Sequence, residues 1–222
     1  MFTSCSQNKI KIPKEFKLAN PPKVWSDDWY KLNNSKNEFK VEITNSKLHI
    51  GKAEKNNECQ LKIETGTFLG IDHGEFGGQL TFIPNDKTKS NIKITRGNIK
   101  FIFQFKDKIY FITGLAHMSH SAGAMFELNT EENNFTYKKV IDFDDAPEAF
   151  AIYNEKILIA SDKSFYIVKD LKKTILFKNV FWEGLYPNSI ATFNNENVFI
   201  GIRSGIVKLD LTHKILKFYK KN

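Results

Sequence analysis

Arginine is nearly absent from this chain of 222 residues, although the formal net charge is +8. Only Arg96 and Arg203 are arginines, so lysine supplies all the other basic side chains. Arginine is the side chain that binds guanine and phosphate through two parallel hydrogen bonds. The lysines are spread along the chain and often fall at turns or on the polar faces of strands, where they discourage edge-to-edge pairing of sheets. We therefore expect a solvated basic surface and no nucleic-acid partner.

The common catalytic and nucleotide-binding motifs are also missing. The sequence contains no G-x-S-x-G, no H-E-x-x-H, no C-x-x-C and no G-x-x-x-x-G-K-[ST]. No apolar run approaches the roughly 18 residues that a membrane-spanning helix needs. These absences remove the support for most hydrolase, zinc-protease, thiol-redox and nucleotide-binding functions.

Helical periodicity and cysteine are scarce as well. No stretch repeats apolar residues with a period of 3.6 between capping residues, so we expect essentially no helix. Of the two cysteines, Cys59 shares a strand face with Leu61 and Ile63, which predicts a small buried hydrophobic side chain.

Alternation of apolar and polar residues dominates from Glu38 onward and predicts strands. Short segments separated by polar turns run from EFKVEIT at residues 38–44 to KILKFY at residues 214–219. In KILIA and SFYIV nearly every position is apolar, so both faces of these strands need to be covered. With 41% hydrophobic residues, including 20 phenylalanines, the chain can bury a sizeable core.

A unit of about 40 residues recurs along the chain. KILIASDKSFYIVKD at residues 156–170 aligns with NVFIGIRSGIVKLD at residues 197–210 at a constant offset of 41 residues. A longer form is KIYFITGLAHMSHSAGAMFEL at residues 108–128, and a looser one is GTFLGIDHGEFGGQLTFI at residues 66–83. Four strands in about 40 residues is the spacing of a β-propeller blade.

This order of strands, with x-N-x-K turns and S/T-x-x-G turns between them, resembles the blades of bacterial β-propeller repeat proteins. The resemblance covers residues 59 to the C-terminus and implies blades that begin near Cys59, Lys100, Glu148 and Ser189. Residues 38–51, with residues 25–32, would supply most of a fifth blade. The expected fold is all-β, a small β-propeller of about five four-stranded blades, with a barrel or sandwich as the alternative.

The first 22 residues are expected to lie outside this domain. Phe2-Thr3-Ser4-Cys5 resembles the lipobox of bacterial lipoproteins, with an apolar residue three positions before the cysteine and a small one directly before it; the family prefers Leu where Phe2 stands. This truncated signal implies lipidation of Cys5, a lipid anchor in the bacterial cell envelope, periplasmic or at the cell surface, and no disulfide with Cys59. Alternatively, the segment is an ordinary N-terminus with a free cysteine. A tether would follow as far as residue 22, and residues 23–222 would form one domain.

The loops distinguish the two ends of the predicted blades. In an up-and-down blade, the hairpin between the second and third strands lies at the same end as the connection to the next blade. At this end the sequence places two long hairpins rich in Gly and His, residues 72–78 and 114–122, and two long connections, residues 142–148 and 181–188. Short turns occupy the opposite end. We expect the first end, here called the loop face, to carry the function, because loops on a rigid scaffold commonly do.

The candidate ligand-binding residues all lie on this loop face: His73, Glu75, His117, His120, Asp144, Asp145, Trp182, Glu183 and Tyr186. Imidazoles with a carboxylate suit a divalent metal, and His73, His117 and His120 are the candidate ligands. They could instead form an acid/base pair, or stabilise the loops through hydrogen bonds.

Other features of the loop face leave similar alternatives open. The acidic residues between 142 and 148 could bind Ca²⁺ or form a solvated turn. The aromatic residues between 181 and 186 could contact a ligand or pack between blades. The glycines are expected to allow left-handed backbone conformations. They are less suited to bind a phosphate group, because no helix follows them to present its N-terminus.

Two functions fit these features. The first is a non-catalytic module outside the cytoplasm that binds a protein, peptide or glycan through the loop face and needs no cofactor. The second is an enzyme that resembles the propeller lactonases and lyases and uses a metal or a histidine pair. The fold alone supports neither, because propellers carry many unrelated functions.

Overall fold

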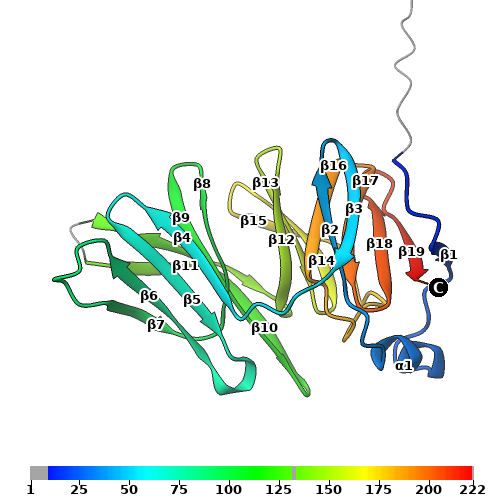
Figure 1. Ribbon diagram of the computed structural model, residues 1–222, viewed down its shortest axis with the longest axis horizontal. Coiled ribbons are helices and arrows are strands. Elements are labelled where there is room, and N and C mark those ends of the chain that lie inside the picture. Colours follow the sequence, from blue (N-terminus) through cyan, green and yellow to red (C-terminus); the bar gives the residue numbers. More distant parts are fainter. Residues whose placement is uncertain (1–9, 132–133, 222) are drawn as a thin grey trace, which may run out of the picture. The chain divides into compact units, whose positions relative to one another are not determined.

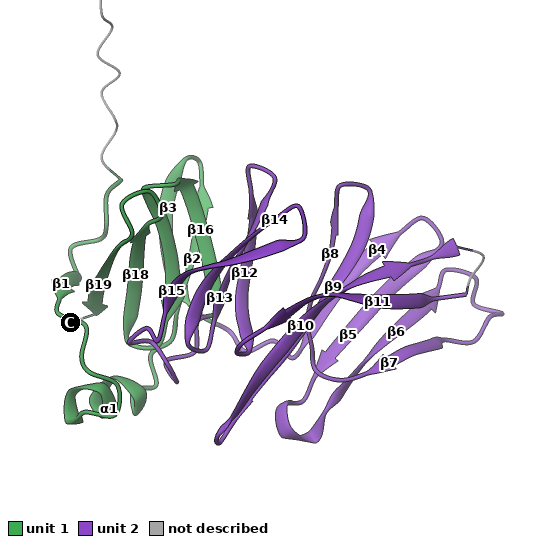
Figure 2. Ribbon diagram, turned by 180° about the vertical axis from the view of Figure 1, so that it is seen from behind, with its two compact units in different colours: residues 1–53, 188–222 green, residues 54–187 purple. Residues whose placement is uncertain are grey.

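The computed structural model describes residues 10–131 and 134–221, and these residues form five β-sheets (Figure 1). The chain divides into two compact units (Figure 2). Unit 1 comprises residues 1–53 and 188–222, and unit 2 comprises residues 54–187. Cys5 and the residues that resemble a lipobox lie outside the described residues. Within the described ranges, no helix has the length and apolar character needed to cross a membrane.

Unit 2 contains three antiparallel sheets of four strands, and within each sheet the strands follow the order of the sequence. The first sheet is β4 (Glu58–Ile63), β5 (Gly66–Asp72), β6 (Gly78–Pro84) and β7 (Ile92–Arg96). The second is β8 (Ile99–Phe105), β9 (Lys108–His117), β10 (His120–Asn129) and β11 (Thr136–Phe143). The third is β12 (Pro147–Tyr153), β13 (Lys156–Ser161), β14 (Ser164–Lys169) and β15 (Lys172–Lys178). A short 3₁₀ turn, η1 (Gly74–Phe76), lies between β5 and β6.

Unit 1 contains a sheet of five strands, a two-stranded hairpin and one helix. The larger sheet is β16 (Ser189–Asn194), β17 (Asn197–Ile202), β18 (Gly205–Asp210) and β19 (Ile215–Lys221), extended by the N-terminal strand β1 (Phe16–Ala19) at the edge of β19. The hairpin is β2 (Phe39–Thr44) and β3 (Lys47–Lys52), and the helix is α1 (Asp27–Asn33).

The predicted fold class is confirmed: the chain is all-β and built of repeated four-stranded blades. The first strands of the four larger repeated sheets begin at Glu58, Ile99, Pro147 and Ser189. Each start lies within one residue of the predicted start of a blade. Every strand from β2 to β19 coincides with a segment that the alternating pattern predicted. The fifth sheet, β2 with β3, has two strands and not the four of a complete blade.

Residues 25–32 differ from the prediction, because most of them form a helix and not part of a blade. Ser26 caps α1 by accepting the backbone N–H of Trp29 at 3.3 Å, and Asp27 and Asp28 occupy the first turn, where carboxylates are favourable. Trp29 is almost fully buried. The expectation that helix is essentially absent is therefore wrong at this one place.

Arg203 attaches this helical segment to the main sheet of unit 1. Its Nη2 lies 2.6 Å from Glu38 Oε1, and its Nη1 donates to the carbonyl of Asn33 at 2.7 Å. Ser204 Oγ donates to the carbonyl of Leu32 at 3.1 Å. The end of α1 is thus satisfied by the hairpin between β17 and β18, which explains why so short a helix is stable here.

Apolar side chains fill the spaces between successive sheets of unit 2. Phe68, Leu80 and Phe111 belong to a cluster formed by the first and second sheets. Ile112, Ile159 and Tyr166 belong to a cluster formed by the second and third. Cys59 packs against the first of these clusters with Leu61 and Ile63, as predicted, and burial raises the pKa of its thiol to about 12.

Candidate functional site

The predicted loop face is present in unit 2. The antiparallel order of the strands places η1, the β9–β10 hairpin, the β11–β12 connection and the loop that follows β15 at the same end of the three sheets. The β5–β6 loop and the β9–β10 hairpin project from the lower edge of this unit in Figure 2. All nine candidate residues lie on this face or directly beneath it.

One histidine of the three predicted metal ligands has a carboxylate partner. His117 Nε2, at the end of β9, lies 3.0 Å from Glu75 Oε2 in η1, and both side chains are about half exposed. His120 stands opposite His117 in the register of the hairpin. The backbone of His73 closes the β5–β6 loop by donating to the carbonyl of Gly77 at 2.8 Å. The described residues contain no group of three or more His, Cys, Asp or Glu that could hold a metal ion, so the metal alternative for these three histidines gains no support from them.

The glycines of the β5–β6 loop serve its backbone conformation. Gly74 has a φ of 60° in the left-handed region, and Gly77 has φ 83° with ψ −159°, a conformation that essentially only glycine adopts. The N–H of Gly74 donates to Asp72 Oδ1 at 2.9 Å, and the N–H of Gly77 donates to the carbonyl of Gly74 at 3.0 Å. Because both N–H groups are engaged within the loop, this segment does not offer them as a phosphate cradle.

The acidic stretch from 142 to 148 is neither one solvated turn nor a calcium loop. Asp142 and Asp144 pair at the surface with Lys139 and Lys173, respectively. Asp145 is only 3% exposed, and the structure therefore corrects its reading as a solvated residue. Burial is possible because the β13–β14 hairpin supplies three donors to this carboxylate.

Asp145 is the centre of a buried hydrogen-bond network. It accepts the hydroxyls of Tyr166 and Ser164 at 2.8 and 2.9 Å, and the backbone N–H of Lys163 at 3.1 Å. Burial and the hydrogen bond to Asp145 raise the pKa of the Tyr166 hydroxyl well above its usual value. The network therefore fixes the β11–β12 connection to the third sheet, and Asp145 is not offered to a ligand.

A second buried network joins all three sheets of unit 2. Lys100 Nζ on β8 lies 2.9 Å from Asp72 Oδ2 at the end of β5 and 3.0 Å from Glu148 Oε2 on β12. The three side chains are only 17–21% exposed. Burial opposes the charge of Lys100, but the attraction of Glu148 and Asp72 outweighs it and raises the pKa of the ammonium. Burial raises the pKa of Glu148, and Lys100 partly offsets this.

The sequence analysis did not find this role of Lys100. The available signal was a lysine at the second position of the otherwise apolar strand IKFIFQF. A charge that enters an apolar strand needs a partner of opposite sign; here the partners are Asp72, the last residue of β5, and Glu148, near the start of β12.

Of the two alternatives for the aromatic residues after β15, ligand contact or packing inside the protein, the structure shows packing for all but one. Trp182 is fully buried, and its indole Nε1 donates to the carbonyl of Ser161 at 3.0 Å. Phe181 is buried beside it. Glu183 pairs with Lys163 at 3.1 Å. Tyr186 is half exposed and is the one member of this group that presents a large ring at the surface.

Two strongly exposed apolar side chains mark the loop face and were not predicted. Phe76 in η1 is 85% exposed, and Met118 at the tip of the β9–β10 hairpin is 94% exposed. Each directly follows a member of the Glu75–His117 pair, so the two loops that carry these apolar residues contact one another next to them. The signal was an apolar residue inside a loop of Gly, His and Ser, where no strand alternation requires one.

A crevice of about 490 Å³ lies between the first and second sheets on the same face. Its walls are small, with Gly74, Gly97 and Ala122 among them, and Glu75 stands at its rim. An added Cβ at Gly74 or Gly97 would meet no atom within 4 Å, so the glycine backbone is open to this space.

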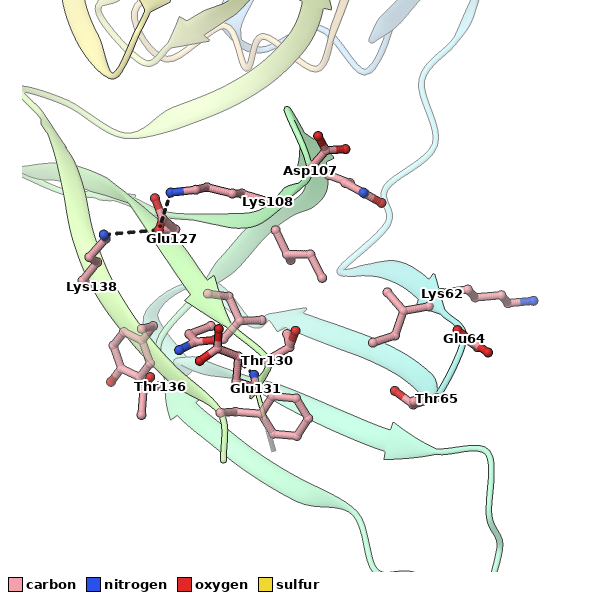
Figure 3. A pocket seen from close by; sticks show the side chains of 17 residues that line it. Lys62, Glu64, Thr65, Asp107, Lys108, Glu127, Thr130, Glu131, Thr136 and Lys138 are labelled. Atoms are coloured by element: carbon pink, nitrogen blue, oxygen red, sulfur yellow. Dashed lines mark hydrogen bonds and ion pairs between the residues drawn. The ribbon is translucent and has the colours of Figure 1, made fainter. Parts of the chain in front are cut away.

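A larger hollow than this crevice lies at the other end of the same sheets (Figure 3). This turn cleft, of about 1070 Å³, is lined by residues of the β4–β5 turn, the β8–β9 turn, the end of β10 with Thr130 and Glu131, and the start of β11 with Phe135. On one wall Lys108 and Lys138 converge on Glu127, with Nζ atoms 2.9 and 3.2 Å from the same oxygen, Oε1. The sequence analysis had assigned only short turns to this end.

Comparison with known proteins gives no family for the chain. No family model matches the sequence, and no curated protein matches it. Among solved structures, the computationally designed Ika4 protein is similar, with a TM-score of 0.44 and 8% sequence identity over 77% of this chain and 94% of that one.

Proposed function

We propose that the protein is a non-catalytic binding module that recognises a protein partner through the loop face of unit 2. The observation that carries this proposal is the pair of apolar tips, Phe76 and Met118, which are 85% and 94% exposed on loops of neighbouring sheets. Phenylalanine and methionine are enriched at protein interfaces and contribute most when they enter a pocket on the partner.

The Glu75–His117 pair supports the proposal because it links the two loops that carry Phe76 and Met118, so that both residues would contribute to one surface. Single exposed apolar side chains are common and need no explanation. Here, however, His117 Nε2 and Glu75 Oε2 lie 3.0 Å apart and link the two loops immediately beside both residues. A preorganised patch loses less conformational entropy on binding than two mobile loops would. Removing each tip from water would contribute about 1.5–3 kcal/mol.

The buried charges beneath the face also favour binding over catalysis. Asp145 is saturated by three donors, and Asp72 and Glu148 share Lys100. Proton exchange between Asp72 or Glu148 and a substrate would have to break contacts that join the three sheets. The crevice of about 490 Å³ beside Glu75 would receive a side chain of the partner.

The test is a capture experiment. The wild-type chain and two variants are each exposed to an envelope extract of the cells that make the protein, and the proteins that each chain retains are compared. In the first variant, Phe76→Ser is combined with Met118→Ser. The matched control is Ile152→Ser, which changes a side chain 44% exposed on β12 of the same unit. We expect a protein that the wild type and the control retain in equal amounts and the double variant loses at least tenfold. A partner that all three chains retain equally would contradict the assignment of the loop face.

A histidine-dependent lactonase or lyase is the alternative function. The contact of His117 with Glu75 favours it, because a carboxylate can orient an imidazole that acts as a general base. The test is hydrolysis or elimination of a panel of lactones and uronates by the wild type and by His117→Gln. We expect no turnover above the buffer rate; turnover that His117→Gln abolishes would establish the enzyme instead.

Anchoring through Cys5 completes the proposal. The support is the resemblance of residues 2–5 to a lipobox, and a lipid at Cys5 would place the module in the bacterial cell envelope. Intact-mass measurement on protein extracted from membranes should show acyl chains that Cys5→Ser removes. An unmodified thiol in membrane-extracted protein would contradict the anchor while leaving the loop-face proposal unaffected.

A further inference from the structure

We propose that the β2–β3 hairpin of unit 1 binds an extended acidic segment of another protein, which adds a strand to the outer edge of β3. This sheet has two strands, whereas each of the other sheets in the described part of the chain continues to four or five. β3 is therefore an edge strand at a place where the other sheets add a third strand. All the residues that carry this inference belong to unit 1, so it does not depend on the proposed partner of the loop face.

The hydrogen-bond pattern of the hairpin determines which backbone groups of β3 face outward. Asn45 and Ser46 form a two-residue turn with φ values of 50° and 57°, and such a turn makes the flanking residues, Thr44 and Lys47, a hydrogen-bonded pair. Bonded pairs then recur at every second residue, and the residues between them direct their N–H and C=O groups away from β2. In β3 these outward residues are Leu48, Ile50 and Lys52.

Two hydrogen bonds agree with this pattern. Val41, which stands opposite Ile50, donates its N–H away from β3 to Ser189 Oγ at 2.8 Å. The N–H of Ala53 donates to the carbonyl of Glu38 at 2.8 Å, which is the next step of the bonded series. Within the described residues, the outward groups of β3 form no hydrogen bond. Each of these residues therefore offers one donor and one acceptor to an added strand.

One face of this edge is apolar. Leu48 is 8% exposed, and Ile50 is partly buried against the same cluster, to which Val41, Phe199 and Ile206 belong. Side chains that stand directly opposite each other in a sheet share a face. Apolar side chains of an added strand, placed opposite Leu48 and Ile50, would therefore extend this cluster.

The charges around β3 indicate an acidic partner. Lys47 and Lys52, at the two ends of the strand, are exposed, and neither pairs with a carboxylate within the described part of the chain. Glu42 on β2 is already paired with Lys40 at 2.9 Å. Unit 1 contains 16 Lys and Arg against 7 Asp and Glu, whereas unit 2 contains 17 against 18. The net positive charge of the chain thus belongs to unit 1, where it would attract an acidic segment.

The same lysines disfavour a second copy of the chain as the occupant. Two β3 strands paired edge to edge would bring four lysines together, and lysines on an edge strand oppose such pairing. Carboxylates opposite these lysines would instead stabilise the added strand. Addition of a strand to an exposed sheet edge is a recurring mode of peptide recognition, in which the main chain supplies affinity and alternate side chains supply specificity.

The experiment measures the fluorescence anisotropy of labelled peptides with the full chain. The probe is the peptide EEVEVE, which in antiparallel orientation places valines opposite Leu48 and Ile50 and glutamates opposite Lys47 and Lys52. We expect saturable binding that weakens as salt is added, and KKVKVK should bind at least tenfold more weakly. N-methylation of both valines, whose N–H groups would face β3, should abolish binding. N-methylation of the glutamates that precede them should leave the Kd unchanged, because those N–H groups would face away.

Variants of β3 test the site itself. Ile50→Pro removes one outward N–H, a change that edge strands tolerate, and should raise the Kd at least tenfold; Ile50→Val is the matched control and should bind normally. The double variant Lys47→Glu with Lys52→Glu should bind KKVKVK in place of EEVEVE, which tests the proposal even if Ile50→Pro does not fold.

The double variant of Phe76 and Met118 should bind EEVEVE normally, so failure of this proposal is distinguishable from failure of the loop-face proposal. Three results would overturn the inference: no binding of any peptide, equal affinity for the two N-methylated peptides, or equal affinity of the wild type for EEVEVE and KKVKVK. Self-association of the wild type that Ile50→Pro abolishes would also overturn it, because the occupant would then be a second copy.

Discussion

The ammonium nitrogen of Lys100 lies 3.0 Å from a carboxylate oxygen of Glu148, although the two residues belong to different sheets. The same nitrogen lies 2.9 Å from Asp72, which ends a strand of a third sheet. Three successive sheets of unit 2 are therefore joined by one buried cation directly beneath the loop face. Asp72 and Glu148 are thus engaged in the scaffold, which is why the proposed binding surface rests on the exposed apolar residues Phe76 and Met118.

Replacing Lys100 by Met should destabilise the protein strongly. Loss of one partner leaves Asp72 and Glu148 as buried carboxylates without their cation, and breaking such a group costs about 3–5 kcal/mol. The measurement is the free energy of unfolding in urea. Lys106→Met is the control, because Lys106 is 48% exposed and pairs with exposed Asp170; it should change stability by no more than about 0.5 kcal/mol. Equal effects of the two changes would show that the Lys100 network is not a structural centre.

Removing the carboxylate of Asp145 should also lower the free energy of unfolding. Asp145→Ala leaves the hydroxyls of Tyr166 and Ser164 and one backbone N–H without an acceptor in a buried place, at a cost of about 3 kcal/mol. Asp142→Ala, in the same connection but at the surface, should cost less than about 1 kcal/mol. Thermal unfolding of the two variants checks this. A larger loss for Asp142→Ala would contradict the assignment of the network.

The stability of the fold should decline at alkaline pH, and Cys59 should contribute to the decline. Burial raises the pKa of its thiol from 9.0 in the unfolded chain to about 12. Between these values the folded protein holds a proton that the unfolded chain releases. The contribution of Cys59 is therefore complete below pH 9 and is lost as the pH rises through about 12, with a slope of up to about 1.4 kcal/mol per pH unit.

The measurement is urea unfolding between pH 8 and pH 11 for the wild type and Cys59→Ala. The variant should lose stability less steeply with pH than the wild type. Some decline should persist, because burial raises the pKa of Tyr166 in the same direction. Parallel curves for the two proteins would show that the thiol is not buried as described.

The strands could be predicted because their signals are local. Alternation in IKFIFQF and near-continuous apolar residues in KILIA depend only on neighbouring positions, and the 41-residue offset repeats them. Strand β1 could not be predicted in this way. It pairs with β19, with Phe16 opposite Lys221, and the partner lies at the far end of the chain. Helix α1 is too short for its period to show, although Ser26-Asp27-Asp28 is a normal helix start.

The common end of the loops that carry the candidate site could be predicted, but the contacts of their side chains could not. Loop lengths place the Gly- and His-rich segments at one end of the sheets, and the antiparallel topology confirms that end. Which side chain meets which depends on register and on contacts between sheets. The sequence thus shows Asp145 and Trp182 as candidates for binding, while the folded chain buries both. Phe76 and Met118 stand out in the sequence only as apolar residues inside polar loops, and the folded chain is needed to show that they are exposed.

The most direct test of the loop-face claim is photo-crosslinking in living cells from single defined positions. A photoreactive phenylalanine analogue replaces Met118 in one strain and Ile152, on β12, in another. If the apolar tips form the binding surface, irradiation should give one discrete covalent adduct with a second protein from position 118 and none from position 152. Adducts from position 152 alone, or from neither position, would contradict the central claim.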